Sequence, residues 1–204
     1  MTPYDEFKQL SDQICQVNSY LVAPLSGMSD SQRRPTDRVN DAALIVFHVF
    51  AFEDFCRHYV SRRARRKGCL HSRLLGKLAW EAEDAGRLSE AMPRLEVVDG
   101  VTMIRDLCAH GLGRRKHLAV PRELTPAALQ RYGFETDDRE DSLDARWWPK
   151  RCVAFAACVS PLVDLARWIA DNLAVQQQAL ASSARSRTRT PQPGAGSDSA
   201  ATRC

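Results

Sequence analysis

The stretch AALIVFHVFAF, at residues 42–52, decides the fold class of this chain. Only His48 interrupts its apolar side chains. Thr36 or Asp37 can cap a helix before it, and Gly68 can end the helix after it, so the pattern predicts one helix from about 36 to 67. A helix that is apolar on nearly all sides is buried in a core or in an interface between subunits.

The same stretch favours a homodimer. A small domain has few other helices with which to cover a helix that is apolar all round, and large uncovered apolar patches mark interaction sites. We therefore expect part of this helix to form a dimer interface, through the face around Val46, Phe47 and Phe50.

The remaining segments also predict helices, and none shows a sustained alternation of apolar and polar residues. The chain therefore belongs to the all-α class, with one helical domain over 1–180. The expected helices lie at about 3–22, 70–92, 99–110 and 143–178, with one or two turns between Thr125 and Gly133. Pro93 is expected to stop the third helix, Asp99 to cap the next, and Pro161 to kink the last.

Residues 181–204 lack large apolar side chains and are rich in Ser, Ala, Arg, Thr, Pro and Gly. We expect a disordered C-terminal tail, because such a segment has nothing to bury.

Length and composition are those of a soluble globular protein: 204 residues, a net charge of +4 and a mean hydropathy of −0.37. The stretch 42–52 is too short to span a bilayer, which takes about 20 residues. No basic start followed by an apolar segment indicates a secretory signal. We expect a cytoplasmic protein that has no membrane partner.

The cysteines and histidines predict no metal site. The seven cysteines are odd in number, and no two have the C-x2-C spacing. Histidine motifs typical of zinc enzymes and the phosphate-binding loop of nucleotide hydrolases are absent from the sequence. We therefore expect reduced thiols, no metal and no cofactor.

The most informative motif is IRDLCAHG, at residues 104–111. Asp106 and His110 are four residues apart and share a helix face, so the carboxylate can accept a hydrogen bond from the imidazole and orient it. Arg105 and His110 are about 140° apart around an ideal helix. They could act on one phosphate only through the length of the arginine or across a dimer axis.

These residue types suit the cleavage of RNA. Histidine can serve as base and acid near neutral pH, and the planar arginine side chain matches phosphate oxygens. The 2′-OH of RNA supplies the nucleophile, so neither a metal nor a nucleophilic side chain is required. The alternative is a surface arginine with a histidine that meets the negative end of the helix dipole.

The motif resembles the R-x4-6-H motif of HEPN domains, small helical modules of prokaryotic defence and toxin systems. Asp106 stands where the family commonly has Asn, Asp or His, and Ala109 and Gly111 flank the histidine as they often do in the family. The resemblance implies a HEPN-like helical bundle and a metal-independent endoribonuclease that leaves 2′,3′-cyclic phosphate ends. In it His110 would be the acid or base, Arg105 would stabilise the phosphate, and Asp106 would orient the pair.

The resemblance also implies partners. HEPN domains usually act as dimers in which two motifs meet in one cleft, and they occur in toxin and anti-phage systems, where an antitoxin or another defence protein is the partner. Some have lost catalysis and only bind RNA or a protein. A non-catalytic helical module that binds RNA or a partner protein is therefore the alternative function.

Three further predictions concern single side chains. Many HEPN domains carry a polar or acidic residue on an earlier helix that faces the motif, and Glu53 is the candidate, unless it pairs locally with Arg57. The run Arg114, Arg115 and Lys116 is a candidate contact for the RNA backbone, with a solvated helix end as the alternative. His48, inside the apolar stretch, is expected to be a hydrogen-bonded core histidine.

Overall fold

The computed structural model describes residues 1–22, 35–62, 64–110, 113–118 and 123–173. The expected tail at 181–204 and the expected end of the last helix at 174–178 lie outside these residues. The chain is all-α apart from one small antiparallel sheet. The helices are α1 (Pro3–Val22), α2 (Pro35–Arg57), α3 (Arg73–Asp84), α4 (Leu88–Ala109), α5 (Pro126–Arg131) and α6 (Arg151–Asn172).

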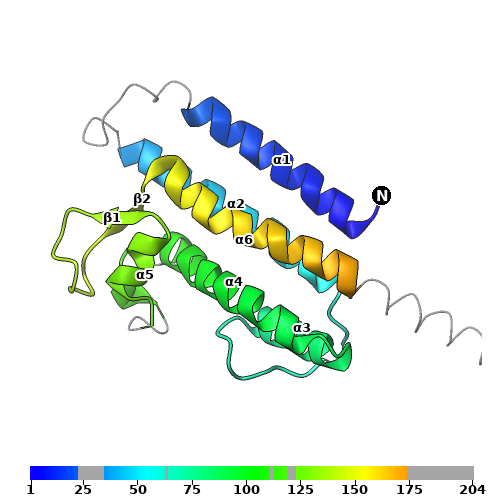
Figure 1. Ribbon diagram of the computed structural model, residues 1–204. Coiled ribbons are helices and arrows are strands. Elements are labelled where there is room, and N and C mark those ends of the chain that lie inside the picture. Colours follow the sequence, from blue (N-terminus) through cyan, green and yellow to red (C-terminus); the bar gives the residue numbers. More distant parts are fainter. Residues whose placement is uncertain (23–34, 63, 111–112, 119–122, 174–204) are drawn as a thin grey trace, which may run out of the picture.

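The long helices form a bundle in which α1, α6 and α4 lie side by side and α2 packs behind α6 (Figure 1). The short helix α3 lies at one end of α4, and α5 lies at the other end beside the sheet. That sheet joins β1 (Phe134–Thr136) to β2 (Trp147–Pro149), and the 3-10 turn η3 (Arg115–His117) precedes α5.

Helix α2 is the centre of the core, as its apolar stretch predicts. Ile45, Val49 and Phe52 are buried between α1, α4 and α6. Burying one such side chain stabilises the fold by about 1.5–3 kcal/mol. The cover is incomplete, because 60% of Phe47 and 45% of Phe50 remain exposed.

His48 is a hydrogen-bonded core histidine, which confirms the prediction. Its side chain is fully buried, and its Nε2 lies 2.9 Å from Ser11 Oγ. The rings of Phe7 and Phe155 meet it edge to face. Burial lowers the pKa of His48 to about 4, because the charged imidazolium would lose its hydration.

The helix expected at 36–67 was predicted too long, since α2 ends at Arg57. The chain after it turns back toward α3 and is anchored there by the buried side chains of Tyr59, Ala64 and Leu70. The basic residues at 62–67 favour a continued helix, but packing of these apolar residues against the core overrides that propensity.

The boundary between the next two helices was also wrong. The chain turns at Gly86, where φ is +70°, and not at Pro93, which lies inside α4. Pro93 is in the second turn of α4, so α4 lacks the one hydrogen bond that its N–H would have given to the Ser89 carbonyl oxygen. Asp99 caps no helix of its own. It is buried in the middle of α4, where its carboxylate has partners from another segment.

The segment after α4 is partly as predicted. Thr125 caps α5 by accepting a hydrogen bond from the Ala128 N–H at 3.2 Å, and Gly133, with φ of +75°, follows the helix. The last helix begins at Arg151 instead of 143, because the residues before it pair as β2 and bury Trp147. Pro161 lies within α6, and the kink stays a prediction.

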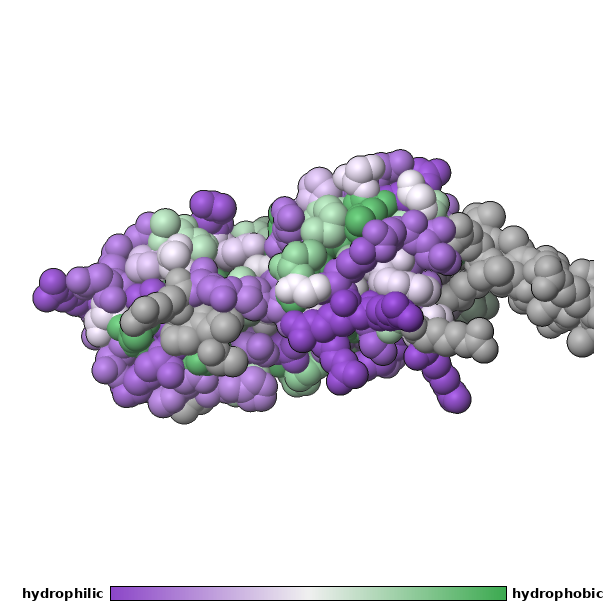
Figure 2. Space-filling model, turned by 90° about the horizontal axis from the view of Figure 1, so that it is seen from below, coloured by the Kyte–Doolittle hydropathy of each residue, from purple (hydrophilic) through white to green (hydrophobic). Residues whose placement is uncertain are grey.

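Part of α6, Val153–Asn172, is long and apolar enough to cross a membrane by length and composition. Half of that segment is buried inside the bundle, as in the core helix of a globular domain. Leu162 and Leu165, for example, are fully buried. Seen from below in Figure 2, the molecular surface is mainly hydrophilic, with hydrophobic residues in separate patches.

Candidate functional site

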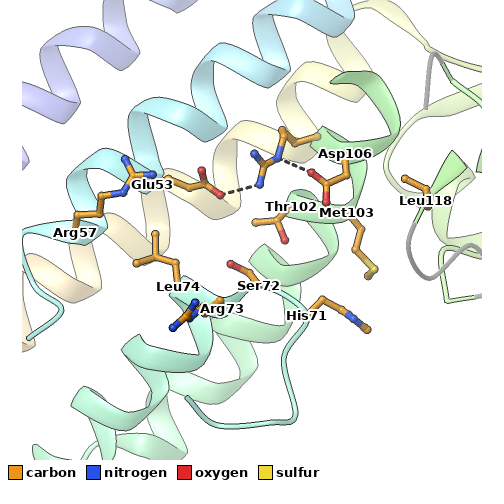
Figure 3. A pocket seen from close by; sticks show the side chains of 11 residues that line it. Glu53, Arg57, His71, Ser72, Arg73, Leu74, Thr102, Met103, Asp106 and Leu118 are labelled. Carbon is orange, nitrogen blue, oxygen red and sulfur yellow. Dashed lines mark hydrogen bonds and ion pairs between the residues drawn. The ribbon is translucent and has the colours of Figure 1, made fainter. Parts of the chain in front are cut away.

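Arg105 of α4 is held by Glu53 of α2. The guanidinium Nη2 donates a hydrogen bond to Glu53 Oε1 at 2.8 Å, and the two side chains are only 16% and 12% exposed (Figure 3). Glu53 therefore faces the motif. The expected local pair of Glu53 with Arg57 is not formed, since Arg57 pairs with Asp54 at 3.3 Å.

Two further groups surround the same guanidinium. Asp106 Oδ1 lies 3.0 Å from Arg105 Nε, an ion pair whose angle is too poor for a hydrogen bond. The Phe50 ring lies under the guanidinium, 5.3 Å from its centre. Two carboxylates and one aromatic face thus fix the arginine, while Nη1 has no hydrogen bond to any residue that the structure describes.

His110 lies elsewhere on α4. It is the exposed C-cap residue, and its backbone N–H donates to the Asp106 carbonyl oxygen at 2.9 Å. The expected bond between its imidazole and the Asp106 carboxylate is not formed, because that carboxylate turns toward Arg105. The structure describes no hydrogen bond or ion pair between Arg105 and His110, and the angle of about 140° between them on an ideal helix stays a prediction.

Arg105 and Asp106 line a cleft of about 500 Å³ between α2, α4 and the start of α3. Figure 3 shows Glu53 and Asp106 along one wall, with Ser72 and Arg73 facing them across the cleft. His110 is not among the lining residues. The cleft combines permanent cations with fixed carboxylates, so it can position an anionic group of matching shape.

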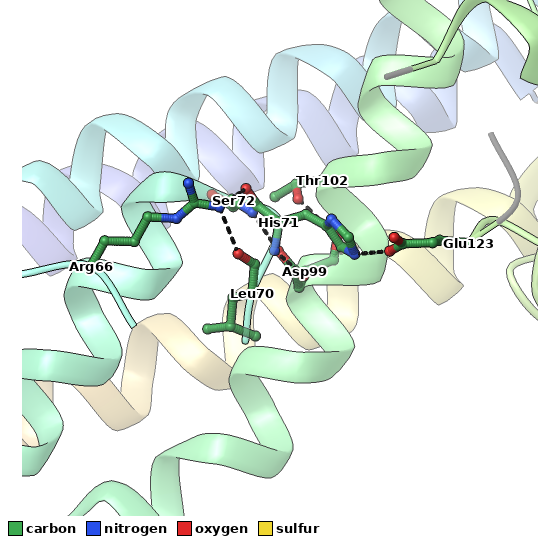
Figure 4. A network of polar contacts seen from close by, with 7 residues as sticks. All are labelled: Arg66, Leu70, His71, Ser72, Asp99, Thr102 and Glu123. Atoms are coloured by element: carbon green, nitrogen blue, oxygen red, sulfur yellow. Dashed lines mark hydrogen bonds and ion pairs between the residues drawn. The ribbon is translucent and has the colours of Figure 1, made fainter. Parts of the chain in front are cut away.

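His71, at the edge of this cleft, was given no role by the sequence. Its Nε2 pairs with Glu123, and its backbone N–H donates to Asp99 Oδ2 at 2.8 Å (Figure 4). The Ser72 N–H donates to Asp99 Oδ1 at 2.8 Å, so one buried carboxylate fixes the entry to α3. No local pattern reveals these partners, because Asp99 and Glu123 are far away in the sequence.

A second, apolar pocket of about 360 Å³ lies beside the end of α4. Phe47, Ala109 and Trp148 line it, and the guanidinium of Arg146 lies 5.3 Å from the Trp148 ring centre. Trp147, also in its wall, is a core residue. This pocket borders His110 through its neighbour Ala109.

The candidate RNA contacts Arg114, Arg115 and Lys116 are largely used within the fold. Arg115 is 4% exposed and donates to four backbone carbonyl oxygens, those of Leu124, Glu140, Asp141 and Ser142. The prediction that Arg115 contacts RNA is therefore wrong, since a side chain so enclosed cannot reach a phosphate. The backbone of Arg114 forms an isolated antiparallel β-bridge with that of Arg146, and the Arg114 residue is half-buried. Lys116 pairs with Asp144.

Over the described ranges of the chain, no three His, Cys, Asp or Glu side chains are grouped so that they could hold a metal ion. The chemistry that the site can offer on these residues is charge stabilisation by Arg105 and proton transfer by an exposed imidazole. Comparisons with family models, curated proteins and solved structures found no match to this chain, so the assignment of function rests on this geometry and on the motif.

Proposed function

We propose that this protein is a metal-independent endoribonuclease of the HEPN type, acting as a homodimer in the cytoplasm. One observation carries the proposal. Arg105, the motif arginine, is fixed by an acidic residue of an earlier helix, Glu53, at 2.8 Å. An arginine on a rigid helix that is oriented by a carboxylate and an aromatic ring is pre-organised for a phosphate.

The chemistry follows from the residue types. A base removes the proton of the 2′-OH, the 2′-oxygen attacks phosphorus, and an acid gives a proton to the departing 5′-oxygen. The products are a 2′,3′-cyclic phosphate and a 5′-hydroxyl. His110 is the group that carries the proton, and Arg105 stabilises the charge on the phosphate through its free Nη1.

The exposed face of α2 supports the dimer. Phe47 and Phe50 are the exposed members of a stretch whose other residues are buried or half-buried, and Phe50 lies against Arg105. The face continues as an apolar groove toward Leu10 and Val17 of α1. A dimer formed through this face would place both motifs at the interface, where Arg105 of one protomer meets His110 of the other.

Incubation of the purified protein with total RNA in EDTA tests the proposal. Cleavage that leaves 2′,3′-cyclic phosphate ends is expected, and His110→Ala should slow it by about 10²–10⁴-fold. Arg105→Ala should weaken both cleavage and binding. His117→Ala, another exposed histidine after α4, is the matched control and should cut normally. Cleavage that needs a divalent metal, or that survives His110→Ala, contradicts the nuclease.

The dimer is tested by sedimentation at micromolar concentration. Phe47→Asp should shift a dimer to monomers, because a charge in an apolar interface is left unpaired. Val153→Asp, on the exposed side of α6, is the control and should leave the dimer intact. A monomeric native protein would contradict the interface and the shared site.

A non-catalytic module that binds RNA or a partner protein is the second candidate. It is favoured by one observation: two of the three Arg105 nitrogens already face carboxylates within the chain. This function predicts RNA binding without product formation by the intact dimer. A role in a toxin or defence system, with an antitoxin or another defence protein as partner, rests on the resemblance alone.

A further inference from the structure

Another hollow, distinct from the apolar pocket at Trp148, adjoins the Arg105 cleft. It is a groove of about 360 Å³. It lies between the chain after α2 and the first turns of α3, and it shares Arg57, Arg73 and Leu74 with the cleft. The two hollows therefore adjoin, and Arg57 and Arg73 stand where they meet. The remaining walls of the groove include Arg62 and Lys77.

Four cations line this groove, and no carboxylate does over the described part of its wall. We call this hollow the basic groove, after its four cations Arg57, Arg62, Arg73 and Lys77. Two acids have their partners among the residues of this wall. Asp54 pairs with Arg57 on the exposed side of α2, and the Glu81 carboxylate accepts the Ser61 N–H at 2.8 Å.

Three of the four cations have no ion pair within the described structure. Arg62 and Arg73 are exposed, and Lys77 is half-buried. Neighbouring members of the same basic run differ, since Arg66 donates to the carbonyl oxygens of Leu70 and His71, and Lys67 pairs with Glu83. Like charges held together without counter-ions raise the local potential and attract a polyanion.

We infer that the basic groove binds the phosphate backbone of single-stranded RNA and leads the strand to Arg105. This inference rests on the proposed function, because the position of the groove beside the Arg105 cleft is what selects RNA among polyanions. The groove reads no base, since its charged groups are suited to phosphates, which carry no sequence information. It takes the backbone role that the buried Arg115 cannot fill.

The experiment measures binding of a fluorescent 12-nucleotide single-stranded RNA by anisotropy at several salt concentrations, in a His110→Ala background that prevents cleavage. The triple variant Arg62→Ala, Arg73→Ala, Lys77→Ala should bind roughly tenfold more weakly or worse, because three phosphate contacts are lost. The slope of log K against log salt should fall by about 2, since each contact to a single strand contributes about 0.7.

A matched control removes three exposed cations from other faces: Lys8→Ala, Arg131→Ala, Lys150→Ala. Its net charge equals that of the triple variant, so an effect of overall charge would appear in both. The control should keep the native slope. Asp54→Asn provides a gain of function: freeing Arg57 should tighten binding severalfold, and an unchanged affinity contradicts the place of Arg57 in the groove.

The outcomes separate the groove from the nuclease. A native salt slope in the triple variant overturns the groove, even if the protein cleaves RNA. A changed slope together with no cleavage by the native protein retains the groove and overturns the nuclease. Duplex RNA of the same length that binds as tightly as the single strand overturns the assignment to single strands.

Discussion

Two arginines from basic segments of similar composition have opposite fates in this molecule. At 114–116 the middle arginine, Arg115, is enclosed by four carbonyl oxygens and is part of the fold. At 62–67 the first residue, Arg62, is exposed beside a groove of like charges. The difference teaches that a basic run shows where cations are, whereas the acceptors that the fold supplies decide whether they remain available to a ligand.

The largest expected effect is on Arg115. Arg115→Ala should lower the free energy of unfolding by about 3–5 kcal/mol, because several loop carbonyls lose a charged donor at once. Urea unfolding measures it. Lys116→Ala is the neighbouring control, and because its pair with Asp144 is exposed, it should cost less than about 1 kcal/mol. Equal losses would contradict the conclusion that the enclosed Arg115 is part of the fold while the exposed Lys116 is not.

His48 is a second buried basic side chain, but unlike Arg115 it has one hydrogen-bond partner among the described residues, Ser11. Its folded pKa of about 4 lies below the ordinary 6.5 of the unfolded chain, so the unfolded state takes up more protons between these values. The stabilisation is complete above about pH 6.5 and is lost as the pH falls toward 4. Between pH 7 and pH 5 the loss from this residue should be on the order of 2 kcal/mol.

Urea unfolding at both pH values measures this loss. The variant His48→Gln removes the titrating group, so its unfolding free energy should vary less between pH 7 and pH 5 than that of the native protein. If native protein and variant respond equally to acid, His48 is not the residue that couples folding to protonation.

Arg105 lies between the two extremes, since it is largely buried but balanced by carboxylates. Glu53→Gln keeps the shape and a hydrogen-bond acceptor and removes the charge, so we expect a loss of about 1–2 kcal/mol in the free energy of unfolding. Asp54→Gln, one residue away and exposed, is the control and should change it little. A loss as large for Asp54→Gln would mean that surface charge and not the pair with Arg105 is responsible.

The smallest expected effect concerns the basic groove. Arg62→Ala with Arg73→Ala should change the free energy of unfolding by less than about 0.5 kcal/mol per site, because exposed side chains without partners lose no contacts. Relief of like-charge repulsion should make the melting temperature equal or slightly higher. A marked destabilisation in a thermal melt would place these cations with Arg115 as part of the fold.

Local rules predicted a good part of this structure. The bounds of α1, the cap at Thr125 and the end of α4 at Ala109 follow from side chains within a few residues of each other. Such features are predictable because the interacting groups are neighbours in the sequence.

Other features have long-range causes and were missed. Asp is a residue type that often caps helices, but Asp99 lies inside α4. Its carboxylate accepts hydrogen bonds from the backbone N–H groups of His71 and Ser72. Trp147 belongs to a strand only because Phe134 and its neighbours pair with that segment. The choice of Arg105 over Arg57 as the partner of Glu53 likewise depends on how α2 packs against α4.

The sequence by itself determined the all-α class, the central position of the apolar stretch and the residue types of the motif, because helix periodicity and capping act over a few residues. Only the tertiary structure decided which charges remain available. Whether an arginine is enclosed, as Arg115 is, or open, as Arg62 is, depends on carbonyl and carboxylate groups brought from distant segments. Burying a charge is favourable only where those acceptors converge.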